Sequence, residues 1–507
     1  MESNTILTIL LFIPILGAVL LLFINKKNQN LIKYFGLAVS VIAFILSVIL
    51  YFNFNIENSE FQFVYKFNWI SNLNISFFVG LDGMSLLLLL LTTFITPLTL
   101  ISSWSSIKKN VKEFTFFMLL LETGIIGVFI SLDLFLFYIF WEIVLIPMYF
   151  IIGIWGGKRR IYASVKFFIF TMVGSLLMLV AIIWLAIYAS SSLGHLSTDI
   201  TELYKIGPTI PRSIQIYMFL AFALSFAIKV PLFPLHTWLP DAHTEAPTAG
   251  SVVLAAVLLK MGTYGLIRFN LPLFPQASIY FAPFISVLAI IGIIYGALVA
   301  MVQTDMKRLV AYSSVAHMGF VVLGIFALTA ESLQGSIIQM VNHGISTGAL
   351  FLLVGFIYER THTREISEYG GIAKLVPIFA FALLFVSLSS IGLPGLNGFV
   401  GEFLILLGSF KSPVLNSWLY TVFATSGVIF AAIYLLWMYQ RVVFGKVTNP
   451  KLEGLKDLNL REIFVLAPIF IFIVWIGIYP NTFLKVSQKS TDKVIEQVFQ
   501  HQNATIK

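Results

Sequence analysis

The sequence predicts an all-α polytopic membrane protein with about 14 transmembrane helices. Of its 507 residues, 59% are hydrophobic and only 11% are charged, whereas soluble domains carry about 25% charged residues. Apolar runs long enough to span a bilayer recur from one end of the chain to the other. Two of these runs are interrupted by prolines, and charged residues lie close to both interruptions.

Each predicted helix corresponds to one apolar run. The predicted spans are 5–24, 31–53, 82–103, 113–131, 132–153, 163–190, 213–235, 248–268, 277–300, 308–330, 332–358, 375–410, 419–442 and 461–483. The first run lacks a basic n-region and a small-residue cleavage site, so we expect a retained helix and not a signal peptide. The polar tail after Phe483 predicts a short surface helix.

The seventh and twelfth spans are each predicted to break. Pro231 and Pro234 interrupt the seventh, and the segment GLPGLNG at 392–398 interrupts the twelfth. Broken helices at matching positions in two halves are typical of transporter repeats, with the ion site at the breaks. Five helices per unit is an odd number, which predicts that the second unit is inverted relative to the first.

This pattern divides the chain into four parts. Residues 1–112 form the first three helices, 113–268 the first repeat and 277–442 the second. Residues 443–507 add the last helix and the polar tail.

Lys and Arg residues are about twice as frequent on one side of these helices as on the other. The positive-inside rule then places both termini outside, which is the periplasm if the host membrane is a bacterial inner membrane. The net charge of +8 therefore reflects membrane orientation, and we expect no nucleic-acid partner.

Five charged residues lie deep within predicted spans: Glu122, Glu142, Lys229, Lys260 and Glu402. Five unpaired charges would cost on the order of 12–18 kcal/mol in a bilayer, which exceeds the stability of most proteins. They must therefore be paired, neutralised or hydrated. Lys229 directly precedes the break in the seventh span, where we expect the ion path.

Histidines extend this polar set. His317 and His343 lie within the tenth and eleventh spans, while His236 and His243 follow the first break. A single buried histidine is most often only hydrogen-bonded, but Gln339, His343, Ser346 and Thr347 share one helical face and could hold a file of water. The histidines are too dispersed for a metal site, so we expect none.

These residue types can relay protons. Burial favours the neutral form of a lysine, and a nearby carboxylate favours its protonated form. A switch between these states is worth roughly 4–7 kcal/mol, and moving one charge across about 150–200 mV costs about 3.5–4.6 kcal/mol. Glu142 acting on Lys229 could therefore drive one proton per cycle.

An energy source is missing from the sequence. It has no Cys, which excludes iron–sulfur clusters and thiolate metal sites held by this chain. It also has no Walker A loop, dinucleotide fingerprint or cofactor-ligand set. An ion gradient or a partner complex must supply the energy.

Four sequence runs form a recognisable set: FWEIVLIPMYFIIGIWGG (140–157), KVPLFPLHTWLPDAHTEAPTAGSVVLAAVLLKMGTYGLIRF (229–269), DMKRLVAYSSVAHMGFV (305–321) and GLPGLNGFVGEF (392–403). They resemble the antiporter-like subunits of respiratory complex I, NADH:quinone oxidoreductase, and among them the chain M (subunit 4) type. The resemblance spans about residues 80–480. It implies a core of fourteen helices with inverted five-helix repeats.

The resemblance also implies roles for single residues. Lys229 matches the central lysine of the family and Glu142 the glutamate that modulates it. Lys260 matches the lysine on the connecting path, and Glu402 the residue near the exit, which looks like lysine in the chain L and chain N types. Further residues match less specifically: His317 and His343 correspond to the axial water chain, His236 and His243 lie in the motif without a settled role, and Glu122 remains an additional candidate.

We therefore expect a proton-translocating membrane subunit without a redox site. NADH, flavin, iron–sulfur clusters and quinone would bind partner subunits, and neighbouring antiporter-like subunits would contact this chain in the bilayer. Two alternatives stay open: a subunit of a multi-subunit cation/proton antiporter, and a structural scaffold that inherited the fold. No acidic cluster indicates a sodium site, which favours protons.

Overall fold

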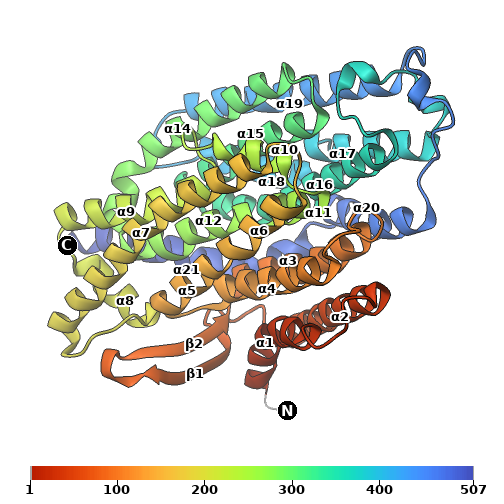
Figure 1. Cartoon of the computed structure of the whole chain (residues 1–507). Helices are drawn as coiled ribbons and strands as arrows, with labels where there is room; N and C mark the ends of the chain where they lie inside the picture. Colours follow the sequence, from red (N-terminus) through yellow and green to blue (C-terminus); the bar gives the residue numbers. More distant parts are fainter. Residues whose placement is uncertain (1–2, 506–507) are drawn as a thin grey trace.

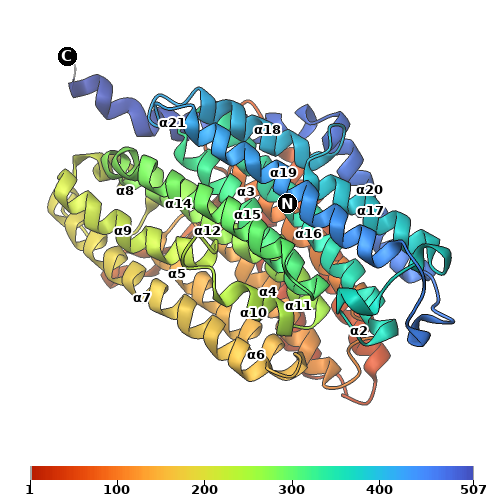
Figure 2. The same ribbon diagram turned by 90° about the horizontal axis from the view of Figure 1, so that it is seen from above.

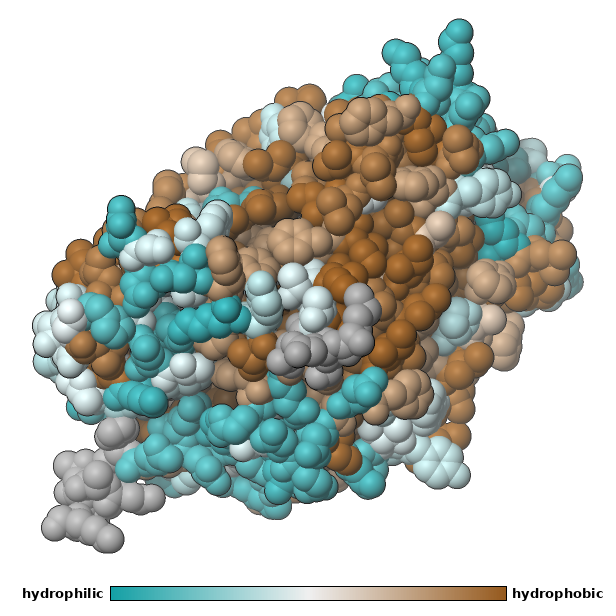
Figure 3. Space-filling model, turned by 90° about the horizontal axis from the view of Figure 1, so that it is seen from below, coloured by the Kyte–Doolittle hydropathy of each residue, from teal (hydrophilic) through white to brown (hydrophobic). Residues whose placement is uncertain are grey.

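Twelve helices in residues 3–505, the part that the computed structural model describes, are long and apolar enough to cross a membrane. Figures 1 and 2 show that the long helices lie side by side with roughly aligned axes. The surface in Figure 3 has a broad apolar area between polar ends, as expected for a bundle in a bilayer. The prediction of an all-α polytopic membrane protein is confirmed.

The first six helices follow the predicted spans closely. They are α1 (Ser3–Leu21), α2 (Gln29–Asn53), α3 (Gly83–Ser102), α4 (Val111–Ile130), α5 (Leu134–Ile143) and α6 (Leu145–Trp155). The last two together form one candidate span. Only Ser131, Leu132 and Asp133 separate α4 from α5, and Asp133 caps α5 by accepting from two of its backbone N–H groups.

The next helices include the first predicted break. They are α7 (Arg160–Leu193), α8 (Ile200–Ile206), α9 (Arg212–Lys229), α10 (Trp238–Glu245), α11 (Thr248–Val253), α12 (Leu259–Gly265) and α13 (Leu271–Leu273). The segment from Thr248 to Leu273 is one continuous candidate span. Two π-helical stretches, Leu254–Leu258 and Leu266–Asn270, lie within it. Such stretches often mark functional positions.

The second half contains the second break. Its helices are α14 (Pro275–Met301), α15 (Met306–Phe326), α16 (Ala330–Thr361), α17 (Pro377–Ile391), α18 (Asn397–Phe410), α19 (Leu419–Val443), α20 (Leu460–Ile478) and α21 (Asn481–Thr505). The pair α17–α18 and the shorter apolar helix α1 account for the two predicted spans that are not among the twelve. The inverted repeat and its boundaries stay predictions.

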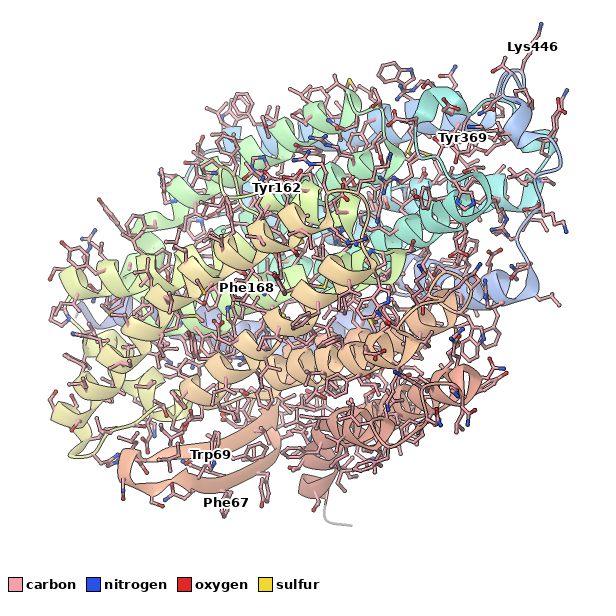
Figure 4. The ribbon with its side chains drawn as sticks, viewed as in Figure 1. Phe67, Trp69, Tyr162, Phe168, Tyr369 and Lys446 are labelled. Atoms are coloured by element: carbon pink, nitrogen blue, oxygen red, sulfur yellow. The ribbon has the colours of Figure 1, made fainter. Side chains whose placement is uncertain are left out.

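A two-stranded hairpin between α2 and α3 was not predicted. Strands β1 (Gln62–Ile70) and β2 (Ile75–Leu81) pair antiparallel, and Asn74 adopts the left-handed conformation at their turn. Leu132 donates to the Phe78 carbonyl at 2.8 Å, which ties the hairpin to the α4–α5 junction. Figure 4 shows Phe67 and Trp69 on this hairpin, at the margin of the molecule.

The C-terminal tail forms a longer helix than predicted. Helix α21 has 25 residues and packs against α3 and α16. At the crossing, Gly83 donates its backbone N–H to Ser490 Oγ at 3.0 Å. A Cβ atom at Gly83 would overlap the carbonyl oxygen of Val486, so the close approach of these helices requires glycine.

We predict that Gly83→Ala loosens the contact between α21 and α3. The added methyl group meets backbone and not a flexible side chain, and overpacking of this kind costs about 1–3 kcal/mol. Limited proteolysis of the purified protein should cut α21 faster in this variant. Gly292→Ala is the matched control, because its Cβ would meet its nearest neighbour at 3.8 Å. Equal cleavage rates in both variants would contradict the prediction.

Candidate functional site

Lys229 ends α9 at the first break and is 1% exposed. Its ammonium group lies over the rings of Trp141 (5.1 Å) and Phe167 (5.6 Å), positions where aromatic faces attract a cation. The break is stabilised locally, because Trp238 Nε1 donates to the Ile228 carbonyl at 2.8 Å. Among the described residues, Lys229 Nζ has no hydrogen-bond partner.

Glu142 lies on α5, directly after Trp141 in the sequence. Glu142 was predicted to lie deep in its span but is only half-buried. The ion pairs formed within residues 3–505 include neither Glu142 nor Lys229. Glu142 Oε1 likewise lacks a hydrogen-bond partner there. The structure thus places Glu142 next to Trp141, whose ring contacts Lys229, without a direct ion pair between glutamate and lysine.

Lys260 and His343 form the most buried contact of the predicted set. Lys260 is fully buried on α12, and its Nζ lies 2.6 Å from His343 Nδ1 on α16. Lys260 Nζ also donates to the carbonyl of Ala255. Ala255 belongs to a π-helical stretch, in which backbone carbonyls pair differently from those of an α-helix.

His317 and Glu402 form a second contact. Nδ1 of His317, on α15, lies 3.1 Å from Oε1 of Glu402 on α18, just after the second break. Gln339 Nε2 donates to the same carboxylate oxygen at 3.3 Å, and Tyr434 OH lies 3.4 Å from His317 Nε2. Glu402 is 4% exposed.

A small polar cavity lies between the two contacts. The rings of His317 and His343 are 5.8 Å apart, and the cavity has room for about one water molecule. Its lining consists of His317, Gln339, Asn342, His343, Ser346, Thr347, Ser389, Ser390 and Gly398. The predicted polar face of α16 therefore lines this cavity.

Polar side chains also form hydrogen bonds with the backbone at the second break. Asn397 begins α18, its backbone carbonyl accepts from Asn342 Nδ2 at 2.7 Å, and its Oδ1 accepts from Ser389 at 2.5 Å. Ser389 Oγ in turn lies 2.6 Å from Ser346 Oγ. Irregular backbone at membrane depth needs such partners within the protein.

The three additional candidates have different surroundings. His243 is fully buried and stacks on Phe351 at 4.5 Å, and both of its ring nitrogens lack partners within the described chain. His236 stacks on Phe233 at 5.8 Å. Glu122 is 1% exposed on α4, and neither of its carboxylate oxygens has a partner in residues 3–505.

Two buried cations were missed because they lie at the ends of apolar runs and look like loop charges. Arg268 Nη2 lies 2.6 Å from Asp82 Oδ2, and Arg268 Nε donates to Tyr264 OH at 3.0 Å. Tyr264 OH donates to the Phe129 carbonyl at 2.9 Å. Lys307, near the start of α15, is 5% exposed and donates to the Ala246 carbonyl.

Two protein families match the chain. Residues 7–127 match the family described as NADH-ubiquinone oxidoreductase chain 4, amino terminus, and residues 131–431 match NADH:quinone oxidoreductase/Mrp antiporter, TM. NADH-quinone oxidoreductase subunit M of Rhodobacter capsulatus is 46% identical, with 94% of each chain covered. NADH-ubiquinone oxidoreductase chain 4 of Chondrus crispus is 44% identical, with 96% of each covered.

Solved structures of two membrane complexes contain chains with a similar fold. A chain of respiratory complex I from Thermus thermophilus with bound NADH is similar with a TM-score of 0.88 and 30% identity, over 97% of this chain and 99% of that one. A chain of the Mrp complex from Dietzia sp. has a TM-score of 0.81 at 20% identity, over 97% of this chain and 52% of that one. The second likeness concerns the fold alone.

We predict that Asp82→Ala destabilises the protein by about 3–5 kcal/mol, because it leaves Arg268 buried and unpaired. The amount of this chain in membranes and the thermal midpoint of the purified assembly should both fall. Glu331→Ala is the control, since the Glu331–Lys411 pair is exposed and worth about 0–1 kcal/mol. Equal stability of the two variants would show that the Asp82–Arg268 pair does not hold this region together.

Proposed function

The chain belongs to the chain 4 (subunit M) family of NADH:quinone oxidoreductase and is a proton-translocating membrane subunit of that enzyme, and we propose that the buried residues described above form its proton relay. The observation that carries the relay is the pair of contacts Lys260–His343 and His317–Glu402, at 2.6 and 3.1 Å, on either side of a cavity of about one water molecule.

Every group in this series can take up and release a proton. Neutral histidine has one donor and one acceptor nitrogen, and lysine and glutamate each exist in two protonation states. A proton on Lys260 can pass to His343, across the cavity to His317, and then to Glu402. Gln339 and Tyr434 hold the carboxylate and the imidazole of the last pair in place.

Lys229 controls proton transfer along this path. Its ammonium group lies over two aromatic rings, and Glu142 directly follows one of them, Trp141, on α5. A movement of Glu142 toward Lys229 would favour the protonated lysine, and a movement away would favour release of the proton. Electron transfer in partner subunits would set this movement in motion.

We place the redox chemistry in those partners. NADH, flavin, iron–sulfur clusters and quinone bind there, and other antiporter-like subunits adjoin this chain in the membrane. We further propose a bacterial inner membrane with both termini on the periplasmic side, following the distribution of Lys and Arg.

The antiporter alternative has weaker support. The family shared with Mrp antiporters covers residues 131–431, but this chain spans only about half of the Mrp chain to which it is similar. Genes for redox subunits beside the gene of this chain would favour complex I, and genes for small antiporter subunits would favour the alternative.

We predict that Lys229→Ala abolishes coupled proton pumping in the assembled complex, because no other cation adjoins Trp141 and Phe167 in the described structure. Protons moved per NADH oxidised, measured in sealed vesicles, are the readout. Glu142→Gln and Lys260→Met should also lower this ratio. A structural scaffold would leave it unchanged in all three variants, and the relay would then be wrong.

Purification of the tagged chain from its native membrane should recover flavin-containing and iron–sulfur-containing subunits. The reason is that this chain has no Cys and must receive energy from redox partners. Visible spectra and peptide identification would reveal them. Recovery of small antiporter subunits without flavin would instead support the cation/proton antiporter.

A further inference from the structure

A pocket with charged lining residues opens on the basic side, where three loops and the start of α15 meet. It lies at the ends of α6, α10 and α16 and at the start of α15, and its volume is about 160 Å³. Its charged lining residues are Glu245, Lys307 and Arg364. Because each loop joins two spans on the same side of the bundle, the pocket faces one side of the membrane.

Lys307 connects this pocket to the interior. It lines the pocket, is 5% exposed, and donates from Nζ to the Ala246 carbonyl at the end of α10. Its neighbour Arg364 does not lead inward, since it pairs with Asp305 at 3.1 Å and donates to the Thr244 carbonyl at 2.7 Å. Lys307 is thus the pocket cation that is both buried and without a carboxylate partner among residues 3–505.

His243 continues the path. It lies one helical turn before Ala246, whose carbonyl accepts from Lys307 Nζ. Its stacking partner Phe351 lies eight residues after His343 on α16, a distance of about 12 Å along that helix. His243 therefore lies between the pocket and the Lys260–His343 contact, with two ring nitrogens unpartnered within the described chain.

We propose that this pocket is the aqueous entrance of the relay and that Lys307 and His243 carry the proton from it to Lys260. This inference rests on the function proposed above and adds the entry residues to it. A proton leaves Lys307 Nζ for a ring nitrogen of His243, and water in the pocket reprotonates Lys307. His243 then passes its proton to Lys260 through intervening water, and Lys260 passes it on to His343, so that each entry group returns to its starting state.

Two substitutions separate proton exchange from a structural role of Lys307. Lys307→Arg keeps a donor toward the Ala246 carbonyl, but a guanidinium does not release its proton. Lys307→Met removes both the donor toward the Ala246 carbonyl and the exchangeable proton. In the assembled complex we expect both variants to pump at least about tenfold fewer protons per NADH. Arg308→Met is the control, because Arg308 is the exposed neighbour of Lys307, and it should pump normally. Normal pumping by Lys307→Arg would overturn the proposal.

A second experiment tests the pocket directly. The chain has no Cys, so Thr248→Cys at the pocket wall and Arg308→Cys outside it each add one thiol. A membrane-impermeant maleimide applied from the basic side should label both and stop pumping only in Thr248→Cys. The parental complex controls for thiols of partner subunits. The proposal that this pocket is the entrance would be wrong if labelled Thr248→Cys pumped fully, or if the thiol of Thr248→Cys were not labelled.

The two proposals can fail separately. Loss of pumping in Lys229→Ala and Lys260→Met, together with normal pumping in Lys307→Arg, would support the proposed relay and contradict the proposed entrance. Normal pumping in all of them would remove the relay itself.

Discussion

The cost of a charge in hydrocarbon governs this structure. An ion inside a bilayer is tolerated only where protein groups or water replace its hydration. The Asp82–Arg268 pair meets this requirement, because the carboxylate and the hydroxyls of Tyr264 and Ser85 all accept from the guanidinium. Such a closed network is rigid. It fixes the Arg268 end of the Thr248–Leu273 segment, which also carries Lys260, beside the end of the β1–β2 hairpin.

The relay residues meet the same requirement only in part. Lys229, His243 and Nε2 of His343 lack hydrogen-bond partners within the described residues. A buried group without a partner is destabilising, but it is also free to accept one. Lysine, histidine and glutamate in series can exchange protons, whereas the guanidinium of Arg268 keeps its proton. The closed network thus uses arginine, which stays charged, and the proposed relay uses residues that exist in two protonation states.

Helix breaks position these groups. At the first break, Lys229 comes last in its helix and Trp238 satisfies the freed carbonyl of Ile228. At the second, Asn397 joins α18 to α16, so that Glu402 reaches His317. The π-helical stretch before Lys260 adds a third irregularity, since the Ala255 carbonyl within it orients the ammonium group toward His343.

The sequence by itself determined the membrane class, the spans, both breaks and four buried charges, Glu122, Lys229, Lys260 and Glu402, because apolar length, proline and charge are local properties of the chain. It did not reveal the β1–β2 hairpin, the full length of α21 or the π-helical stretches. It also could not pair Lys260 with His343, or assign Lys307 to the interior, because these contacts join residues from different helices. Only the packing of α10, α12, α15 and α16 decides which polar faces meet, and distance between side chains is the quantity that proton transfer depends on.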